Sequence, residues 1–158
     1  MMIDHLTLTV RNLASASDFY AKALAPLGYS KQRDYGVVQG FGPEGKPAFW
    51  LKQGDAPQSV MHLAFRSRDR SSVDGFHAAA LAAGATDEGA PGLREHYHPH
   101  YYGAFIVDPD GHHIEAVCHV PLGSTEGTVS ARPSAAAVPK KKAPPKKKAA
   151  AKARRKKR

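Results

Sequence analysis

The feature that most constrains the fold of this 158-residue chain is an internal repeat. Each half opens with an alternating strand that begins at a histidine, His5 in the first half and His62 in the second. A segment with helical spacing of apolar residues follows each strand, over residues 13–24 and 71–81. Further strand-like segments come after each helix. This duplication predicts two copies of one βαβββ unit, packed together to bury a common core.

Local signals set the expected boundaries inside each unit. Ser15 and Ser71 are each followed three positions later by an aspartate, a pattern typical of helix N-caps. The Asp-Pro-Asp-Gly turn at 108–111 separates two strand-like segments and predicts a hairpin. The expected fold is α+β, with tandem βαβββ modules over about residues 1–56 and 57–120. We expect them to form a curved, half-open mixed β-barrel with the helices outside.

The composition of the chain changes sharply after residue 120. Residues 1–120 hold 10 Lys and Arg against 13 Asp and Glu, whereas residues 121–158 hold 13 basic residues and one acidic residue. We expect a linker over 121–134 and a disordered basic tail over 135–158, because Lys, Ala and Pro offer little apolar surface to bury. From Lys140 to Arg158 the charge predicts nonspecific binding to nucleic acid by counterion release. An anionic membrane surface or a role in solubility stays open.

Several protein classes are excluded by simple counts. The only cysteine, Cys118, cannot form an intrachain disulfide or a Cys-rich metal site. No apolar run approaches the roughly 20 residues that cross a bilayer, so no membrane span is expected. The first five residues lack the charged and apolar regions of a signal peptide. We therefore expect a cytoplasmic location.

Four short motifs accompany the repeat: Asp4-His5-Leu6-Thr7-Leu8, Asp18-Phe19-Tyr20, His62-Leu63-Ala64-Phe65 and Asp108-Pro109-Asp110-Gly111-His112-His113-Ile114-Glu115. The repeat and these motifs together resemble the vicinal oxygen chelate superfamily. That superfamily includes glyoxalase I, bleomycin-resistance proteins, fosfomycin-modifying enzymes and extradiol ring-cleaving dioxygenases. The resemblance covers about residues 1–120 and implies a small-molecule substrate, a divalent metal ion and the possibility of a homodimer.

Three residues are candidate metal ligands. Strand alternation places His5, His62 and Glu115 on the sheet face opposite the helices, where a pseudo-twofold pairing of the halves would bring them together. Two imidazoles and one carboxylate suit Fe, Mn, Ni or Zn. The resemblance implies the same three positions as ligands of a divalent metal that chelates vicinal substrate oxygens. Trp50 departs from the glyoxalase I pattern, because it stands about where that enzyme has a fourth ligand, a glutamate.

The segment at 94–103 is dense in histidine and tyrosine. A histidine near a metal can act as a general acid or base, and a tyrosine hydroxyl can donate to a developing oxyanion. By resemblance to extradiol dioxygenases, His98 and Tyr102 are the candidate catalytic residues, with His100 as the alternative histidine. These aromatic residues could instead simply cap the mouth of the barrel.

Two functions follow from the sequence and stay open. The first is a metal-dependent enzyme with lyase, ring-cleaving dioxygenase or thiol transferase chemistry. The second is a metal-free protein that binds and sequesters a small molecule, with a tail that binds nucleic acid.

Overall fold

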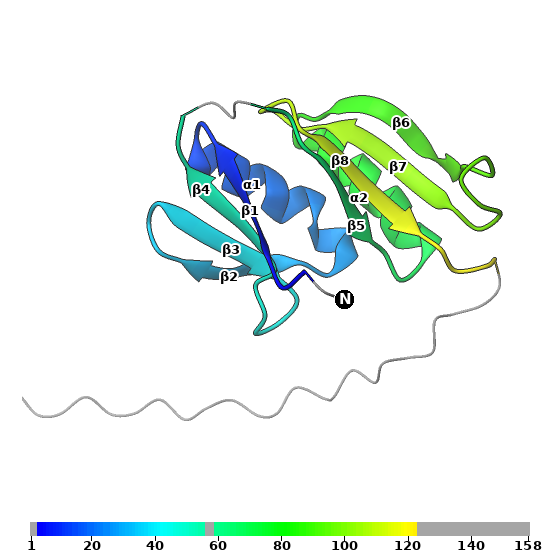
Figure 1. Ribbon diagram of the computed structural model, residues 1–158, viewed down its shortest axis with the longest axis horizontal. Coiled ribbons are helices and arrows are strands. Elements are labelled where there is room, and N and C mark those ends of the chain that lie inside the picture. The colour runs from blue at the N-terminus through cyan, green and yellow to red at the C-terminus, as the bar shows by residue number, and fades with distance from the viewer. Residues whose placement is uncertain (1–2, 56–58, 123–158) are drawn as a thin grey trace, which may run out of the picture. The chain divides into compact units, whose positions relative to one another are not determined.

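The computed structural model describes residues 3–55 and 59–122 (Figure 1). The predicted module boundary at 56/57, the tail and all but the first two residues of the linker lie outside the described residues. The elements in chain order are β1 (Leu6–Val10), α1 (Leu13–Ala23), the 3-10 turn η1 (Ala25–Leu27), β2 (Ser30–Asp34), β3 (Val38–Gly42), β4 (Phe49–Gln53), β5 (His62–Arg66), α2 (Arg70–Ala82), β6 (Thr86–Leu93), β7 (Tyr102–Val107) and β8 (His113–Cys118).

The strands form two mixed four-stranded sheets, one from each module. Sheet A has the order β1-β4-β3-β2, and sheet B has the order β5-β8-β7-β6. In each sheet the first two strands are parallel and the others are antiparallel. This identical topology confirms the predicted α+β fold and tandem βαβββ modules. The described strands do not close into a barrel, since neither sheet pairs with the other.

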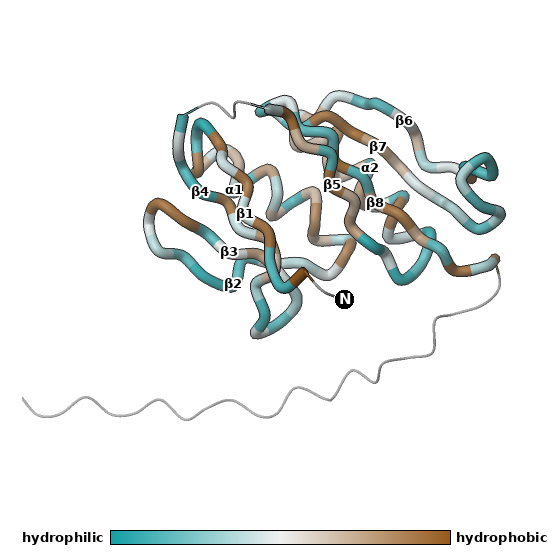
Figure 2. Tube along the Cα trace, viewed as in Figure 1, coloured by the Kyte–Doolittle hydropathy of each residue, from teal (hydrophilic) through white to brown (hydrophobic). Residues whose placement is uncertain are grey.

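Both helices cover one face of the sheets and lie behind the strands in Figure 1. Alternate strand residues point toward them: Leu8 and Leu51 in sheet A, and Ile114 and Ala116 in sheet B, are all almost fully buried. The helices also contact each other, so one core serves both modules. Figure 2 shows the apolar stretches of the strands that supply this core. Within the described ranges, no helix is both long and apolar enough to span a membrane.

The helices begin earlier than the predicted caps, so the assignment of Ser15 and Ser71 as N-caps was wrong. Asn12 caps α1, and its side-chain oxygen accepts from the backbone N–H of Ser15 at 3.0 Å. Asp69 caps α2 and accepts from the backbone N–H of Ser72 at 2.7 Å. The Ser71 hydroxyl donates to Asp69, and this bond and the one from Ser72 lower the pKa of the Asp69 carboxyl. Asn and Asp side chains accept these bonds as well as serine does, and each stands just before its helix.

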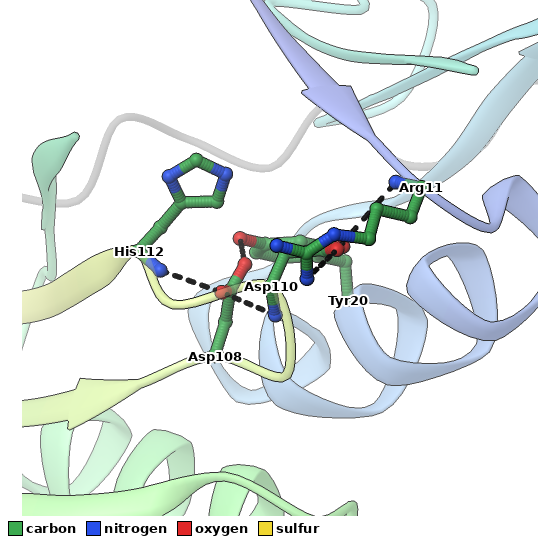
Figure 3. A network of polar contacts seen from close by, with 5 residues as sticks. All are labelled: Arg11, Tyr20, Asp108, Asp110 and His112. Atoms are coloured by element: carbon green, nitrogen blue, oxygen red, sulfur yellow. Dashed lines mark hydrogen bonds and ion pairs between the residues drawn. The ribbon is translucent and has the colours of Figure 1, made fainter. Parts of the chain in front are cut away.

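A buried polar network ties the β7–β8 turn of the second module to α1 of the first (Figure 3). The hydroxyl of Tyr20 donates to Asp108 Oδ2 at 2.5 Å, and the backbone N–H groups of Asp110 and His112 donate to Asp108 Oδ1. Arg11, just after β1, contacts the Asp110 carboxylate at 3.4 Å. Burial, and then the Asp108 charge, raise the pKa of Tyr20 well above its ordinary value. The predicted hairpin turn therefore also holds the two modules together.

Candidate functional site

The face of sheet B that points away from the helices carries the histidines and the carboxylate singled out in the sequence. Because β8 is an inner strand, Glu115 has a cross-strand neighbour on each side, Ala64 on β5 and Phe105 on β7. On the same two strands, two residues before Ala64 and Glu115, His62 lies opposite His113. Cross-strand partners share a face, so these side chains gather on one surface, which we call the open face.

Glu115 is the polar centre of the open face. Only 3% of this residue is exposed, and both of its oxygens have partners. Oε2 lies 3.0 Å from Nε2 of His62, while Oε1 accepts a hydrogen bond from the hydroxyl of Tyr101. A buried carboxylate without such partners would be strongly destabilising. The two contacts therefore fix the Glu115 carboxylate within the sheet, with both of its oxygens occupied by hydrogen-bond partners.

Tyr101 covers the carboxylate from solvent. Burial, and then the hydrogen bond to Glu115, raise the pKa of Tyr101, so its hydroxyl remains a donor at neutral pH. Gly103 lies beneath this contact. A Cβ atom there would be 3.1 Å from Cε1 of Tyr101 and 3.3 Å from Oε1 of Glu115. The glycine thus leaves the space in which the tyrosine ring reaches the carboxylate.

A pair of histidines packs against the same tyrosine. His98 Nε2 lies 2.7 Å from His119 Nδ1, and the two rings are 5.4 and 5.2 Å from the Tyr101 ring. His98 Nδ1 accepts from the backbone N–H of His100 at 3.1 Å. Since Nδ1 of a neutral His98 is then unprotonated, its Nε2 carries the proton and donates to His119. These contacts fix the position of Tyr101 above Glu115.

A pocket of about 350 Å³ opens beside this cluster. Its size is at the lower end of the range for small-molecule sites. His62 lines the pocket. Glu115 is not a lining residue, and its link to the pocket is the contact with His62. The lining residues are His62, Glu88, Gly89, Arg94, His96, Tyr97, Phe105 and His113.

The structure brings two of the three predicted metal ligands together. His62 and Glu115 are in contact, but His5 lies just before β1 of the other sheet, where its Nδ1 is 2.8 Å from the exposed carboxylate of Asp4. Across residues 3–55 and 59–122, no group of three His, Cys, Asp or Glu side chains is placed to hold one ion. β1 pairs with β4 and β5 pairs with β8, so each sheet takes its strands from one module. Within the described residues of one chain His5 is not placed with His62 and Glu115, and the ligand set stays a prediction.

The two predicted catalytic residues lie on opposite faces of sheet B. His98 packs on Tyr101 at the open face, whereas the Tyr102 hydroxyl donates to Asp74 of α2 at 2.7 Å. The guanidinium of Arg70 also lies over the Tyr102 ring, 4.9 Å from its centroid. Catalytic roles for His98 and Tyr102 stay predictions. Sequence reasoning passed over Tyr101, although alternation counted back from Gly103 would have placed it on the open face.

The chain has two βαβββ modules of identical topology, with a helix on one face of each sheet and a polar open face on sheet B. These features define a class of paired-module α+β proteins. The model of the family described as a glyoxalase-like domain matches residues 5–117. The chain therefore belongs to the glyoxalase-like domain family, within the vicinal oxygen chelate superfamily.

Solved structures agree with this assignment. A glyoxalase/bleomycin resistance protein from Albidiferax ferrireducens T118 is 27% identical, with a TM-score of 0.64 over 76% of this chain and 100% of that one. A glyoxalase/bleomycin resistance protein/dioxygenase family enzyme from Burkholderia phytofirmans PsJN is 20% identical, with a TM-score of 0.59 over 75% of this chain and 98% of that one. At that lower identity, the second likeness shows the fold alone. A comparison with curated proteins gives no match.

Proposed function

We propose that this chain binds a small molecule in the pocket on the open face of sheet B, and that His62 is the group that exchanges a proton with it. One observation carries the proposal. The Glu115 carboxylate is buried and bound on both oxygens, whereas the His62 side chain, 59% exposed, lines the pocket. An exposed imidazole backed by a buried carboxylate is an arrangement suited to general acid–base chemistry.

Glu115 orients the imidazole in this proposal. Because the carboxylate accepts at Nε2, a neutral His62 carries its proton there and keeps Nδ1 as the basic nitrogen. Nδ1 is then the atom that takes a proton from, or returns one to, a molecule in the pocket. Tyr101 holds the other carboxylate oxygen, which keeps Glu115 from turning away from His62.

Ligand titration followed by ¹H–¹⁵N NMR tests this function. A set of small organic acids and carbonyl compounds is added to the wild-type chain and to His62→Gln, with Lys52→Gln as the control for an exposed residue of sheet A. We expect amide shifts around His62, Phe105 and His113 in the wild type and the control, and at least tenfold weaker binding in His62→Gln. Shifts confined to another surface, or equal affinities of all three proteins, would refute the proposal.

A metal-dependent enzyme is the second candidate, and a different observation favours it. His62 Nε2 and Glu115 Oε2, an imidazole nitrogen and a carboxylate oxygen of the kinds that bind such metals, lie 3.0 Å apart. His62 and Glu115, with His5 as the predicted third ligand, would hold Fe, Mn, Ni or Zn, which would act as a Lewis acid or an oxygen-activating centre. Lyase, ring-cleaving dioxygenase and thiol transferase chemistry all remain open on this alternative.

Metal content decides between the two candidates. The chain is purified without chelator or a histidine tag, and its metal is measured beside that of His5→Ala, His62→Ala and Glu115→Ala. His100→Ala serves as the matched control for metal adsorbed at an exposed imidazole. A metal content that is the same in all five proteins excludes this alternative.

The basic tail supplies a separate, weaker proposal. It is supported by the 13 basic residues that face one acidic residue after residue 120. This segment lies almost wholly outside the described residues. Retention of DNA by the full chain should fall steeply with added salt and be lost on truncation after Val120. Retention that survives truncation would exclude it. The predicted homodimer is checked on the same samples by analytical ultracentrifugation.

A further inference from the structure

We propose that the pocket selects small organic anions and that Arg94 is the residue that binds their carboxylate or phosphate group. This inference rests on the proposed function, because it names the class of ligand for the same pocket. It is carried by the way in which the Arg94 guanidinium is held, by the glycines that surround it and by its charge.

The Arg94 side chain is fixed by the backbone of its own module. Its Nη2 donates to the carbonyl oxygen of Ala90 at 2.8 Å, and its Nη1 lies 3.5 Å from the carbonyl oxygen of Leu93. The guanidinium lies over the Phe105 ring, 5.5 Å from the ring centroid. The backbone N–H of Arg94 donates to the carbonyl oxygen of Tyr101 at 2.7 Å, which anchors the start of the loop. A guanidinium held in this way loses little conformational entropy when it binds a ligand.

Two glycines of β6 make the space that Arg94 occupies. A Cβ atom at Gly92 would be 2.8 Å from Nη1 of Arg94, and one at Gly89 would be 3.4 Å from Nη2. The Gly89 Cβ would also lie 3.1 Å from the Phe105 ring. The pairing of β6 with β7 is irregular at these same residues, with register shifts on both sides of Gly89. The edge strand β6 therefore leaves room at these two glycines for the guanidinium of Arg94.

The charge of Arg94 favours an anion. Within the part of the chain that the structure describes, Arg94 forms no ion pair, and its contacts are to carbonyl oxygens. The acidic lining residue, Glu88, is already bound by His113, whose Nδ1 lies 2.6 Å from Oε1. An arginine has five N–H donors, so donors remain after the two carbonyl contacts. Carboxylate and phosphate groups accept pairs of such donors in a fixed geometry.

The neighbours of Arg94 further define the ligand. Phe105 offers an aromatic face to a planar group next to the anion. The His62 ring is 6.4 Å from the Phe105 ring, so a ligand anchored at Arg94 and lying along Phe105 approaches the proposed proton-exchanging nitrogen. The expected ligands are therefore small aromatic or conjugated carboxylates and phosphates.

The test uses the full-length chain and three probes: benzoate, its neutral analogue benzamide, and inorganic phosphate. Binding is followed by the amide shifts of Gly89, Gly92 and Phe105. The variants are Arg94→Gln and, as a matched control, Arg33→Gln, which removes an exposed arginine of β2 that also donates to a backbone carbonyl. We expect benzoate to bind at least tenfold more tightly than benzamide, and phosphate to shift the same amides. Arg94→Gln should weaken benzoate at least tenfold, and Arg33→Gln less than twofold.

Each outcome bears on one claim. Benzoate and benzamide binding at the pocket with equal affinity, unaffected by Arg94→Gln, would overturn the anion anchor and leave the proposed function standing. Failure of both anions to bind would also overturn the anchor, whereas the proposed function is refuted by shifts confined to another surface or by unchanged affinity in His62→Gln. Arg94→Lys covers the case in which Arg94→Gln does not fold. It keeps the charge but not the planar pair of donors, so benzoate should bind about tenfold more weakly, and wild-type affinity would overturn the assignment.

Discussion

Replacing Tyr20 with phenylalanine tests how the two modules are held together. The substitution removes only the hydroxyl that donates to Asp108 Oδ2 at 2.5 Å, because both residues are buried and the ring still fits the core. A hydrogen bond to a charged group contributes about 1.5–3 kcal/mol. The backbone donors of Asp110 and His112 bind the other oxygen, so Oδ2 loses the one hydrogen bond that it has among the described residues. We therefore expect a loss of about 2–3 kcal/mol in the free energy of unfolding.

Urea unfolding measures this loss. With a slope of about 1–3 kcal/mol per M for a small protein, the midpoint should fall by about 0.7–3 M while the transition stays single. Tyr29→Phe is the matched control, because within the described chain the Tyr29 hydroxyl has no hydrogen bond and its ring packs on Phe65. The control should change the free energy of unfolding by less than about 0.5 kcal/mol. A Tyr20→Phe loss as small as that of the control would refute the role assigned to this network.

Three further predictions concern local features. Gly103→Ala should keep the fold but displace the Tyr101 ring from Glu115, with a loss of about 1 kcal/mol or more that urea unfolding detects and a change in the Tyr101 ring signals in NMR. Asp69→Ala removes the cap of α2 and should lower the free energy of unfolding by about 1 kcal/mol. Because the pKa of Asp69 is lowered in the folded chain, this stabilisation is present above its ordinary value of 3.8 and is lost as the pH falls below it, so urea midpoints of variant and wild type should converge in acid. The raised pKa of Tyr20 has the opposite effect on the pH dependence. The stabilisation that the Tyr20 hydroxyl contributes is present below pH 10.0 and is lost as the pH rises above that value. The urea midpoint should therefore fall in alkali less steeply in Tyr20→Phe than in the wild type.

The features that the sequence predicts well depend on local patterns. The two strand–helix repeats and the hairpin at 108–111 are each encoded within a few residues, by apolar spacing or by turn residues. The side of the sheet on which His62 and Glu115 lie also follows from alternation along single strands. These features are found in the structure as expected.

Features that depend on pairing between distant strands could not be read in the same way. Whether His5 meets Glu115 depends on how the two sheets lie side by side, because each module completes its own sheet. Tyr102 and Tyr101 differ by one position and so point to opposite faces, and the register of β7 against β8 places Tyr102 opposite the buried Cys118. The setting of Arg94 depends on irregular pairing of β6, for which the sequence carries no periodic signal.

The site rests on one contact, the hydrogen bond by which Glu115 fixes the imidazole of His62. Long-range ¹H–¹⁵N NMR of the histidine rings, recorded at about pH 8 where an ordinary imidazole is neutral, measures it directly. The account predicts that His62 is present as the tautomer protonated at Nε2, and that Glu115→Gln gives a mixture of tautomers. A His62 ring protonated mainly at Nδ1 in the wild type, or a tautomer ratio that Glu115→Gln leaves unchanged, would contradict it.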